Sequence, residues 1–264
     1  MKRKDGIVLI TGASEGIGRA TAAAFAAQGY DLLLLARGAE RLQQLADSLV
    51  GTFGTDCRTL QADVRNSDEL IHTITAALEG RQLAAAIVNA GIGLYGPFGR
   101  TDWNDIEQVL RTNFDGAIAS ARAVVPVLER QGHGSLILVS STIGKRAVPF
   151  NAVYSATKQG LIGFADALRL ELKPHRVHVG VVCPARTDTP FFERMKYSVP
   201  QTKRRKIPTN PPEMVAKAIL RCMRSRKREI VVSGPGKIFA FVGYHFPRLT
   251  DYLLYHNVPR PTDA

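Results

Sequence analysis

The chain has few cysteines and no long apolar run, and these deficits exclude several classes of protein. Cys57, Cys183 and Cys222 are odd in number and widely spaced, which suits neither a disulfide framework nor a zinc site. We expect buried thiols in a reducing compartment. No run approaches the roughly 18 apolar residues of a membrane-spanning helix, and residues 1–4 lead almost directly into a strand-like segment without an apolar signal. The expected location is therefore the cytoplasm.

Acidic residues are also in short supply, with 23 Asp and Glu against 35 Lys and Arg and a net charge of +12. Much of the excess lies in Lys203–Lys206 and Arg221–Arg228. No nucleic-acid-binding motif accompanies these clusters, so we expect no nucleic-acid partner. An apolar, aromatic tail over residues 237–255 favours peripheral contact with an anionic membrane. The alternative is a solvated basic face and a tail that packs on the body or on another subunit.

No linker, internal repeat or low-complexity tract divides the 264 residues, which predicts a single domain over 1–264. Short apolar runs alternate with helical patterns along the chain. Such alternation predicts an α/β fold with a doubly wound parallel sheet of about seven strands and helices on both faces. The expected strands are Ile7–Ile10, Asp31–Ala36, Arg58–Ala62, Ala85–Asn89, Ser135–Ser140, Val177–Cys183 and Glu229–Ser233.

A glycine-rich turn follows the first expected strand. Residues Thr11–Gly18 connect that strand to a segment of helix formers, Arg19–Gln28, which Gly29 closes. Glycines in a strand-turn-helix unit let the backbone approach a pyrophosphate, which then binds at the positive end of the helix. The spacing is Gly-x-x-x-Gly-x-Gly, so the alternative of a tight turn without a ligand stays open. The glycines concerned are Gly12, Gly16 and Gly18.

Arg37 ends the second expected strand. In a dinucleotide-binding unit this position faces the adenosine ribose, where an acidic residue binds the 2′-hydroxyl and an arginine accommodates a 2′-phosphate. Arg37 therefore favours NADP(H) over NAD(H), with Arg41 as a second candidate. The alternative is a solvated arginine that opens the next helix.

Tyr154 and Lys158 stand one helical turn apart. A tyrosine with an ordinary pKa near 10 is a poor acid or base at pH 7, and a neighbouring ammonium is expected to lower that pKa. The same spacing also describes ordinary neighbours on a helix surface.

Together these motifs resemble those of the short-chain dehydrogenase/reductase family, single-domain type, from about Ile7 to about Ser233. The resemblance implies a Rossmann-type fold and assigns residues to two groups. The catalytic residues would be Asn113, Ser141, Tyr154 and Lys158. The cofactor-binding residues would be Gly12, Ser14, Gly16, Ile17, Gly18, Arg37, Asp63, Val64, Asn89, Ala90, Gly91, Tyr154, Lys158, Pro184, Thr187 and Thr189; no metal is expected.

The resemblance also implies a division of labour for interconverting a ketone and a secondary alcohol. Ser141 and Tyr154 would donate hydrogen bonds to the carbonyl oxygen, and Tyr154 would give up its proton. Lys158 would hold the nicotinamide ribose, and Asn113 would position a water that links Lys158 to solvent. Ser140 and Thr142 are alternative hydroxyls, but the family's thirteen-residue separation from Tyr154 selects Ser141.

Two positions depart from the family pattern. Ala185 replaces the glycine that follows Pro184, and it remains small. Glu15 stands in the glycine turn where some NADP-preferring members carry a basic residue, so Arg37 receives little help from that turn.

Residues 186–212 would form a lid over the substrate, and residues 234–264 a C-terminal extension like that of reductases acting on lipid or steroid ketones. Aromatic side chains in several loops favour a bulky apolar substrate, although each also fits simple lid packing. The resemblance implies a homodimer or homotetramer. A cofactor-binding regulatory or scaffold protein is the alternative function. The aromatic residues that favour a bulky apolar substrate are Tyr95, Phe98, Phe150, Phe191 and Phe192.

Overall fold

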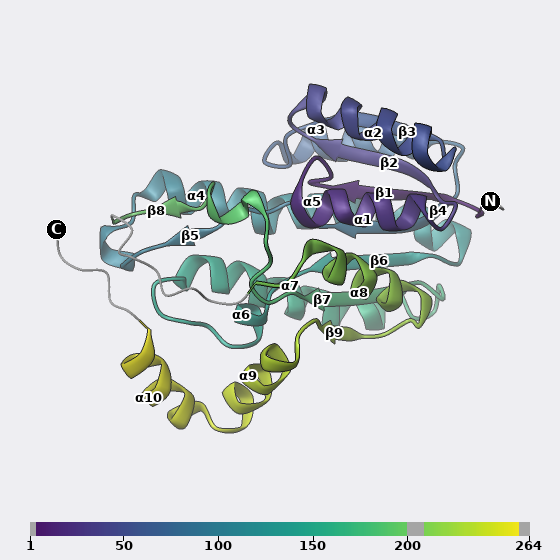
Figure 1. Ribbon diagram of the computed structural model, residues 1–264. Helices are drawn as coiled ribbons and strands as arrows, with labels where there is room; N and C mark the ends of the chain where they lie inside the picture. The colour runs from purple at the N-terminus through teal and green to yellow at the C-terminus, as the bar shows by residue number, and fades with distance from the viewer. Residues whose placement is uncertain (1–3, 200–208, 259–264) are drawn as a thin grey trace.

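The structure is a computed structural model that describes residues 4–199 and 209–258. Its main sheet has seven parallel strands in the order β3-β2-β1-β4-β6-β7-β9, which confirms the predicted Rossmann-type fold (Figure 1). The strand order reverses direction between β1 and β4, so ligands are expected at the carboxyl ends there. The strands are β1 Ile7–Thr11, β2 Asp31–Ala36, β3 Cys57–Gln61, β4 Leu83–Val88, β6 Ser135–Val139, β7 His178–Cys183 and β9 Glu229–Val231.

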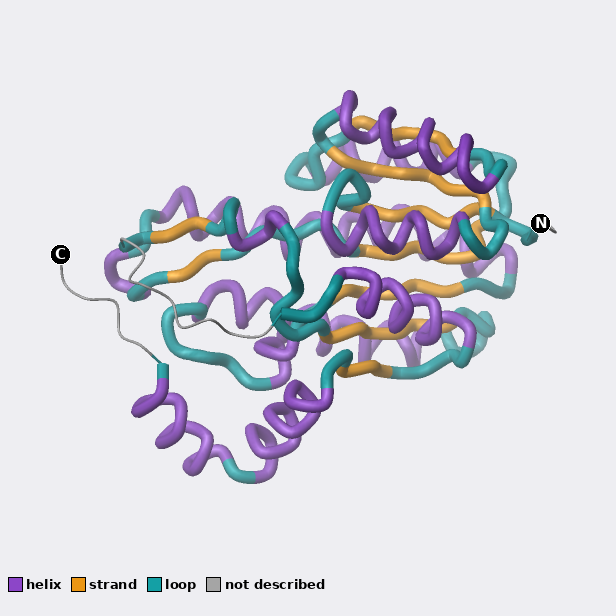
Figure 2. Tube along the Cα trace, in the orientation of Figure 1, coloured by secondary structure: helices purple, strands orange, loops and turns teal. Residues whose placement is uncertain are grey.

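Helices cover both faces of this sheet, as Figure 2 shows in purple and orange. One face packs against α1 (Gly16–Ala26), α2 (Ala39–Phe53) and α8 (Pro212–Arg224). The other packs against α3 (Ser67–Leu78), α5 (Gly116–Gln131) and α7 (Ala152–Glu171). Two apolar cores therefore hold the sheet between them.

The second strand shows why the predicted strands are continuous apolar runs. Leu33 and Leu35 lie in the core beneath α3 and α5, whereas Leu32 and Leu34 lie in the core beneath α1 and α2. Because successive side chains point to opposite faces, a strand covered on both sides needs apolar residues at every position.

The cysteine prediction is only partly correct. All three thiols are free; Cys183 and Cys222 are buried, whereas Cys57 is half-exposed on β3, an edge strand of the sheet. Burial raises the pKa of Cys183 and of Cys222 to about 12, so both stay protonated at neutral pH.

A small second sheet was not anticipated. Strand β5 (Leu94–Tyr95) pairs in parallel with β8 (Lys196–Tyr197), about a hundred residues later. This pairing fixes part of the expected lid, which also contains a 3₁₀ turn at Pro190–Phe192. The basic cluster Lys203–Lys206 lies outside the described residues.

The expected C-terminal extension begins with two helices, α9 (Gly234–His245) and α10 (Pro247–Asn257), which form a V below the body in Figure 1. Helix α9 packs on α6 (Thr142–Lys145). Arg146 holds α10 through an ion pair with Asp251 and a hydrogen bond to the Pro247 carbonyl. Within the described ranges, no helix has both the length and the apolarity needed to cross a bilayer.

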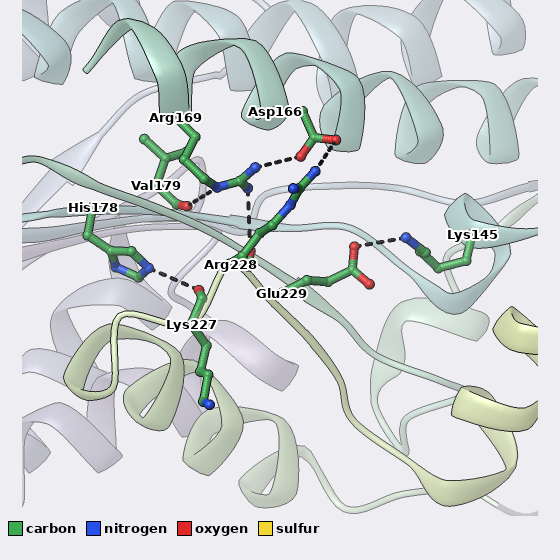
Figure 3. A network of polar contacts seen from close by, with 8 residues as sticks. All are labelled: Lys145, Asp166, Arg169, His178, Val179, Lys227, Arg228 and Glu229. Carbon is green, nitrogen blue, oxygen red and sulfur yellow. Dashed lines mark hydrogen bonds and ion pairs between the residues drawn. The ribbon is translucent and has the colours of Figure 1, made fainter. Parts of the chain in front are cut away.

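The edge strand β9 is held by a polar network that uses part of the second basic cluster (Figure 3). Asp166 on α7 binds Arg228 at 2.9 Å and Arg169 at 2.6 Å. Lys145 binds Glu229 at 2.9 Å. These contacts fasten the strand that precedes α9 to the rest of the sheet.

Candidate active site

A cleft of about 850 Å³ opens where the strands of the main sheet end. It is bordered by the turns after β1, β2, β3, β4, β6 and β7, the place where parallel α/β sheets bind ligands. Most of the predicted catalytic and cofactor-binding residues line it. The exceptions are Gly18 and Asn113, which lie behind its wall, and both have structural reasons to be there.

The glycine turn is held in shape by close backbone contacts. Gly12 has a φ of +65°, and a Cβ there would meet Ala90 Cα at 2.9 Å. A Cβ on Gly18 would stand 2.0 Å from the Gly12 carbonyl oxygen, so only glycine lets α1 start against this turn. Asn89 donates through Nδ2 to the carbonyls of Thr11 and Gly12. Asn89 thus secures the turn.

The N-terminus of α1 points its first N–H groups at the cleft. Glu15 occupies the N-cap position with an extended backbone and makes no capping hydrogen bond, and the first turn carries no acidic residue. Ser14, Gly16 and Ile17 line the cleft here, and Thr189 faces Gly16. A helix start with uncapped donors beside a glycine cradle fits a pyrophosphate.

Glu15 is the acidic centre of a small ion cluster. It pairs with Arg41 on α2 at 3.4 Å and with Arg194 from the lid segment. Arg37 also borders the cleft at the end of β2. The sequence did not reveal the contact with Arg194, because the two residues come together only through the fold.

Asp63 borders the cleft after β3 and is held by Arg65 through a two-pronged ion pair with a shortest distance of 2.6 Å. Burial alone would raise the pKa of Asp63, but the hydrogen bonds and charge of Arg65 lower it overall. Val64 packs tightly on Gly116, because a Cβ on Gly116 would stand only 2.7 Å from the Val64 carbonyl oxygen. Arg65 is a positioning residue that the sequence reasoning missed.

Tyr154 and Ser141 meet at the centre of the cleft. Burial raises the pKa of Tyr154 well above its ordinary value, and the nearby Ser141 hydroxyl partly opposes this effect. The Ser141 hydroxyl also accepts a hydrogen bond from the Ile143 N–H at 3.3 Å. Ser140 turns away and donates to the Lys158 carbonyl at 2.7 Å. The Ser140 hydroxyl is therefore already used, whereas Ser141 and Thr142 also line the cleft.

Lys158 lies beneath Tyr154 with its Nζ 5.8 Å from the centre of the phenol ring. It is buried and donates to the Val139 carbonyl at 3.0 Å. Burial lowers the pKa of Lys158 to about 8. The expected lowering of the Tyr154 pKa by this ammonium is not seen in the structure, where the desolvation of the phenol dominates.

Asn113 is buried in a π-helical segment, Arg111–Asp115, between α4 (Trp103–Leu110) and α5. Its side-chain amide accepts from the Ile92 N–H and donates to the Ile92 carbonyl, both at 2.8 Å. A Cβ on Gly91 would stand 3.2 Å from Asn113 Oδ1 and 3.3 Å from Lys158 Nζ. The structure thus brings Asn113 and Lys158 together across Gly91.

The loop after β7 closes the cleft from the other side. Pro184, Ala185 and Thr187 line it, and Thr187 donates to the Ala185 carbonyl at 2.9 Å. Arg186 also borders the cleft, with its guanidinium 4.0 Å from the centre of the Phe192 ring. The place of Arg186 in the cleft was not predicted from the sequence.

The aromatic residues divide into two groups. Phe191 and Phe192 line the cleft, and Phe191 lies 5.8 Å from the Tyr154 ring between centres. Tyr95 instead packs on Phe150 at 5.8 Å, away from the lining, and Phe98 is exposed. Tyr95, Phe98 and Phe150 therefore follow the alternative of simple loop packing, and for Tyr95 the reason is that β5 joins the small second sheet.

The doubly wound sheet, the uncapped helix start behind a glycine cradle, and the Ser141–Tyr154–Lys158 arrangement define a nicotinamide-dependent oxidoreductase. Residues 6–198 match the family described as short chain dehydrogenase. The chain belongs to this family, whose enzymes interconvert alcohols and carbonyl compounds.

Relatives and solved structures agree with this assignment. The chain is 33% identical over 266 residues to the uncharacterized oxidoreductase YxnA of Bacillus subtilis (strain 168), covering 97% of this chain and 74% of that protein. It is 32% identical to the ketoacyl reductase HetN of Nostoc sp., covering 86% and 78%. A short-chain dehydrogenase from Sphingobium yanoikuyae in complex with NADPH has a TM-score of 0.80 and 27% identity over 98% of each chain.

Proposed function

We propose that this protein is an NADP(H)-dependent oxidoreductase that interconverts a ketone and a secondary alcohol on a hydrophobic, lipid-like substrate. Tyr154 acts as the general acid and base. The observation that carries this proposal is that Tyr154 and Ser141 line the same cleft, with the Lys158 ammonium 5.8 Å from the centre of the Tyr154 ring.

The site residues supply donors and a proton path. The cofactor provides the hydride, and the charge that develops on the carbonyl oxygen needs fixed donors nearby. Ser141 and Tyr154 donate to that oxygen, and Tyr154 delivers its proton in the reductive direction. Lys158 binds the nicotinamide ribose. Asn113, whose side-chain amide is held by Ile92, positions a relay water that links Lys158 to solvent.

The preference for NADP(H) is supported by the charges around the adenosine end of the cleft. Arg37 lies at the end of β2, where a 2′-phosphate is recognised, and Arg41 lies beside it on α2. No acidic residue occupies the position of Arg37, so the 2′-hydroxyl of NAD(H) lacks its usual partner. The NADPH complex of the Sphingobium relative is consistent with this choice.

The substrate class follows from the lid side of the cleft. Phe191, Phe192 and Met195 line it with apolar surface close to the Tyr154 ring. The relative HetN is a ketoacyl reductase, a name that likewise places a ketone on an acyl chain. We propose the same combination here, with residues 186–212 as the lid, residues 234–264 as the extension, and a homodimer or homotetramer as the assembly.

Replacing Tyr154 with Phe tests the mechanism. The ring and its contact with Phe191 remain, while the proton donor is lost. We expect ketone-dependent NADPH oxidation to fall at least about hundredfold, the usual contribution of general acid–base catalysis. NADPH binding, followed by nicotinamide fluorescence, should remain.

Tyr30→Phe is the matched control, because this tyrosine packs on Phe25 away from the cleft and should keep full activity. Wild-type-like turnover in the Tyr154 variant would refute the assigned acid.

A further inference from the structure

The two C-terminal helices carry one pattern of side chains twice, eleven residues apart. Each helix has a basic residue, an aliphatic residue, an aromatic residue and a Tyr-His pair at the same relative positions. These positions fall on one side of an α-helix. The sequence reasoning missed this short repeat because it lies within the tail and does not divide the domain. The repeated face consists of Lys237, Ile238, Phe241, Tyr244 and His245 on α9 and of Arg248, Leu249, Tyr252, Tyr255 and His256 on α10.

Every residue of the repeated face is exposed. Tyr244 is 80% exposed, Phe241 59% and Tyr252 63%. In each helix the histidine ring lies 4.4 Å between centres from the first aromatic ring, Phe241 in α9 and Tyr252 in α10. The same local side-chain cluster is thus built twice on the surface.

The opposite side of α9 is the one that packs on the protein. A Cβ on Gly236 would stand 2.8 Å from Thr142 Cγ2, and one on Gly243 would stand 2.7 Å from Arg146 Cγ. Glycines on this side let α9 lie close to α6, the turn that follows Ser141. The repeated face therefore points outward beside the candidate active site.

Apart from one paired aspartate, the charged side chains of the two helices are positive. Lys237 and Arg248 belong to the repeated face, whereas Asp251, the single acidic residue between 234 and 258, is paired with Arg146. Basic residues beside Tyr and Phe on one helical face are the composition that binds anionic lipid headgroups at the membrane–water interface.

We propose that the repeated face docks on the surface of an anionic lipid bilayer, with α9 and α10 lying in its interface. A second copy of the chain fits less well, because a symmetric contact brings this positive face against itself. Docking places the Ser141 end of the cleft next to the source of an apolar substrate. The docking itself is independent of the proposed reaction.

The other described basic cluster is less suited to this task. Arg228 is bound by Asp166, and Arg226 donates to the Arg176 carbonyl at 2.8 Å (Figure 3 shows the Asp166 contact). Arg224 donates to Gln28 Oε1. These side chains hold the edge of the fold together.

Flotation of the full chain with vesicles tests the proposal. We expect wild-type protein to float with phosphatidylcholine vesicles that contain about 30 mol % phosphatidylserine, and much less with phosphatidylcholine alone. Reversing both charges, Lys237→Glu with Arg248→Glu, should weaken binding to the anionic vesicles at least about tenfold. The pair Phe241→Ser with Tyr252→Ser should also weaken it, through loss of inserted apolar area.

Lys217→Glu with Arg221→Glu is the matched control, since it reverses two exposed charges on α8 outside the repeated face. It should float like the wild type. Thermal melts and NADPH fluorescence of each variant show whether the body is folded, and turnover of a water-soluble ketone shows whether the chemistry is intact.

Absence of wild-type flotation on anionic vesicles would overturn the proposal, as would equal flotation of the wild type and the variant with Lys237→Glu and Arg248→Glu. A change of oligomeric state in the variants of the repeated face, without any effect on flotation, would assign the face to a subunit contact instead. Failure of the reaction with intact flotation would count against the proposed function alone.

Discussion

At the scale of a single residue, the burial of Lys158 in the candidate active site lowers the stability of the folded protein. Its side chain is buried, and burial lowers its pKa to about 8. In the unfolded chain a lysine keeps a pKa near 10.4. Below pH 8 both states are protonated, so the folded protein bears the full cost of a buried ammonium. As pH rises from 8 toward 10.4 the folded state releases its proton first, and that cost falls.

Replacing Lys158 with Met should therefore raise stability while it abolishes reduction. We expect a gain on the order of 3 kcal/mol at pH 7 that shrinks to less than about 1 kcal/mol at pH 10. Denaturant unfolding of the variant and the wild type at both pH values measures the difference. Lys217→Met, at an exposed position on α8, should show no such pH dependence. A gain of equal size at both pH values would show that the ammonium is not destabilised by burial.

At the scale of elements, the turns after β1 and β2 set the charge that meets the adenosine end of the cofactor. Arg37 follows β2 directly, and Glu15 at the start of α1 pairs with Arg41 on α2. A charge-assisted hydrogen bond contributes about 1.5–3 kcal/mol, so one arginine at this place can separate the two cofactors by more than tenfold.

Two substitutions in these turns should move cofactor preference in opposite directions. Arg37→Ala should weaken NADPH binding at least about tenfold and change NADH binding little. Glu15→Gln should strengthen NADPH relative to NADH, because Arg41 is released from its carboxylate. Fluorescence titrations with both cofactors measure the ratio. NADH is the internal control, because loss of the Arg194 contact affects both cofactors alike; parallel changes would remove Arg37 and Arg41 from 2′-phosphate recognition.

At the scale of the whole molecule, the net charge of +12 favours the approach of anionic ligands. The cleft that receives them is bordered by Arg37, Arg41, Arg186, Arg194 and Lys196. NADPH carries one phosphate more than NADH, so the field of the protein acts on it more strongly. Salt screens such long-range attraction over about 10 Å at 0.1 M.

We expect the association rate of NADPH to fall more steeply with ionic strength than that of NADH. Stopped-flow binding between low and physiological salt measures both rates. Dissociation rates recorded in the same traces separate steering from contact strength. Equal slopes for the two cofactors would show that the positive charge of the chain does not steer its ligand.

The sequence by itself determined the fold class and most of the cleft lining. A parallel strand covered on both faces must be apolar throughout. A continuous apolar run such as Leu32–Leu35 therefore predicts a buried strand from a few neighbouring residues. Gly12 and Gly18 do the same for the turn, because their neighbours leave no space for a Cβ. Such constraints act over a few neighbouring residues, so a single sequence is enough to recognise them.

Tertiary structure alone decided the features that depend on distant partners. The pairing of β5 with β8 joins segments about a hundred residues apart and removes Tyr95 from the pocket. The contact of Glu15 with Arg194, and the outward direction of the repeated face, likewise arise from the packing of separate elements. The raised pKa of Tyr154 belongs here too. Its spacing from Lys158 is local, but desolvation depends on everything that the fold places around the phenol.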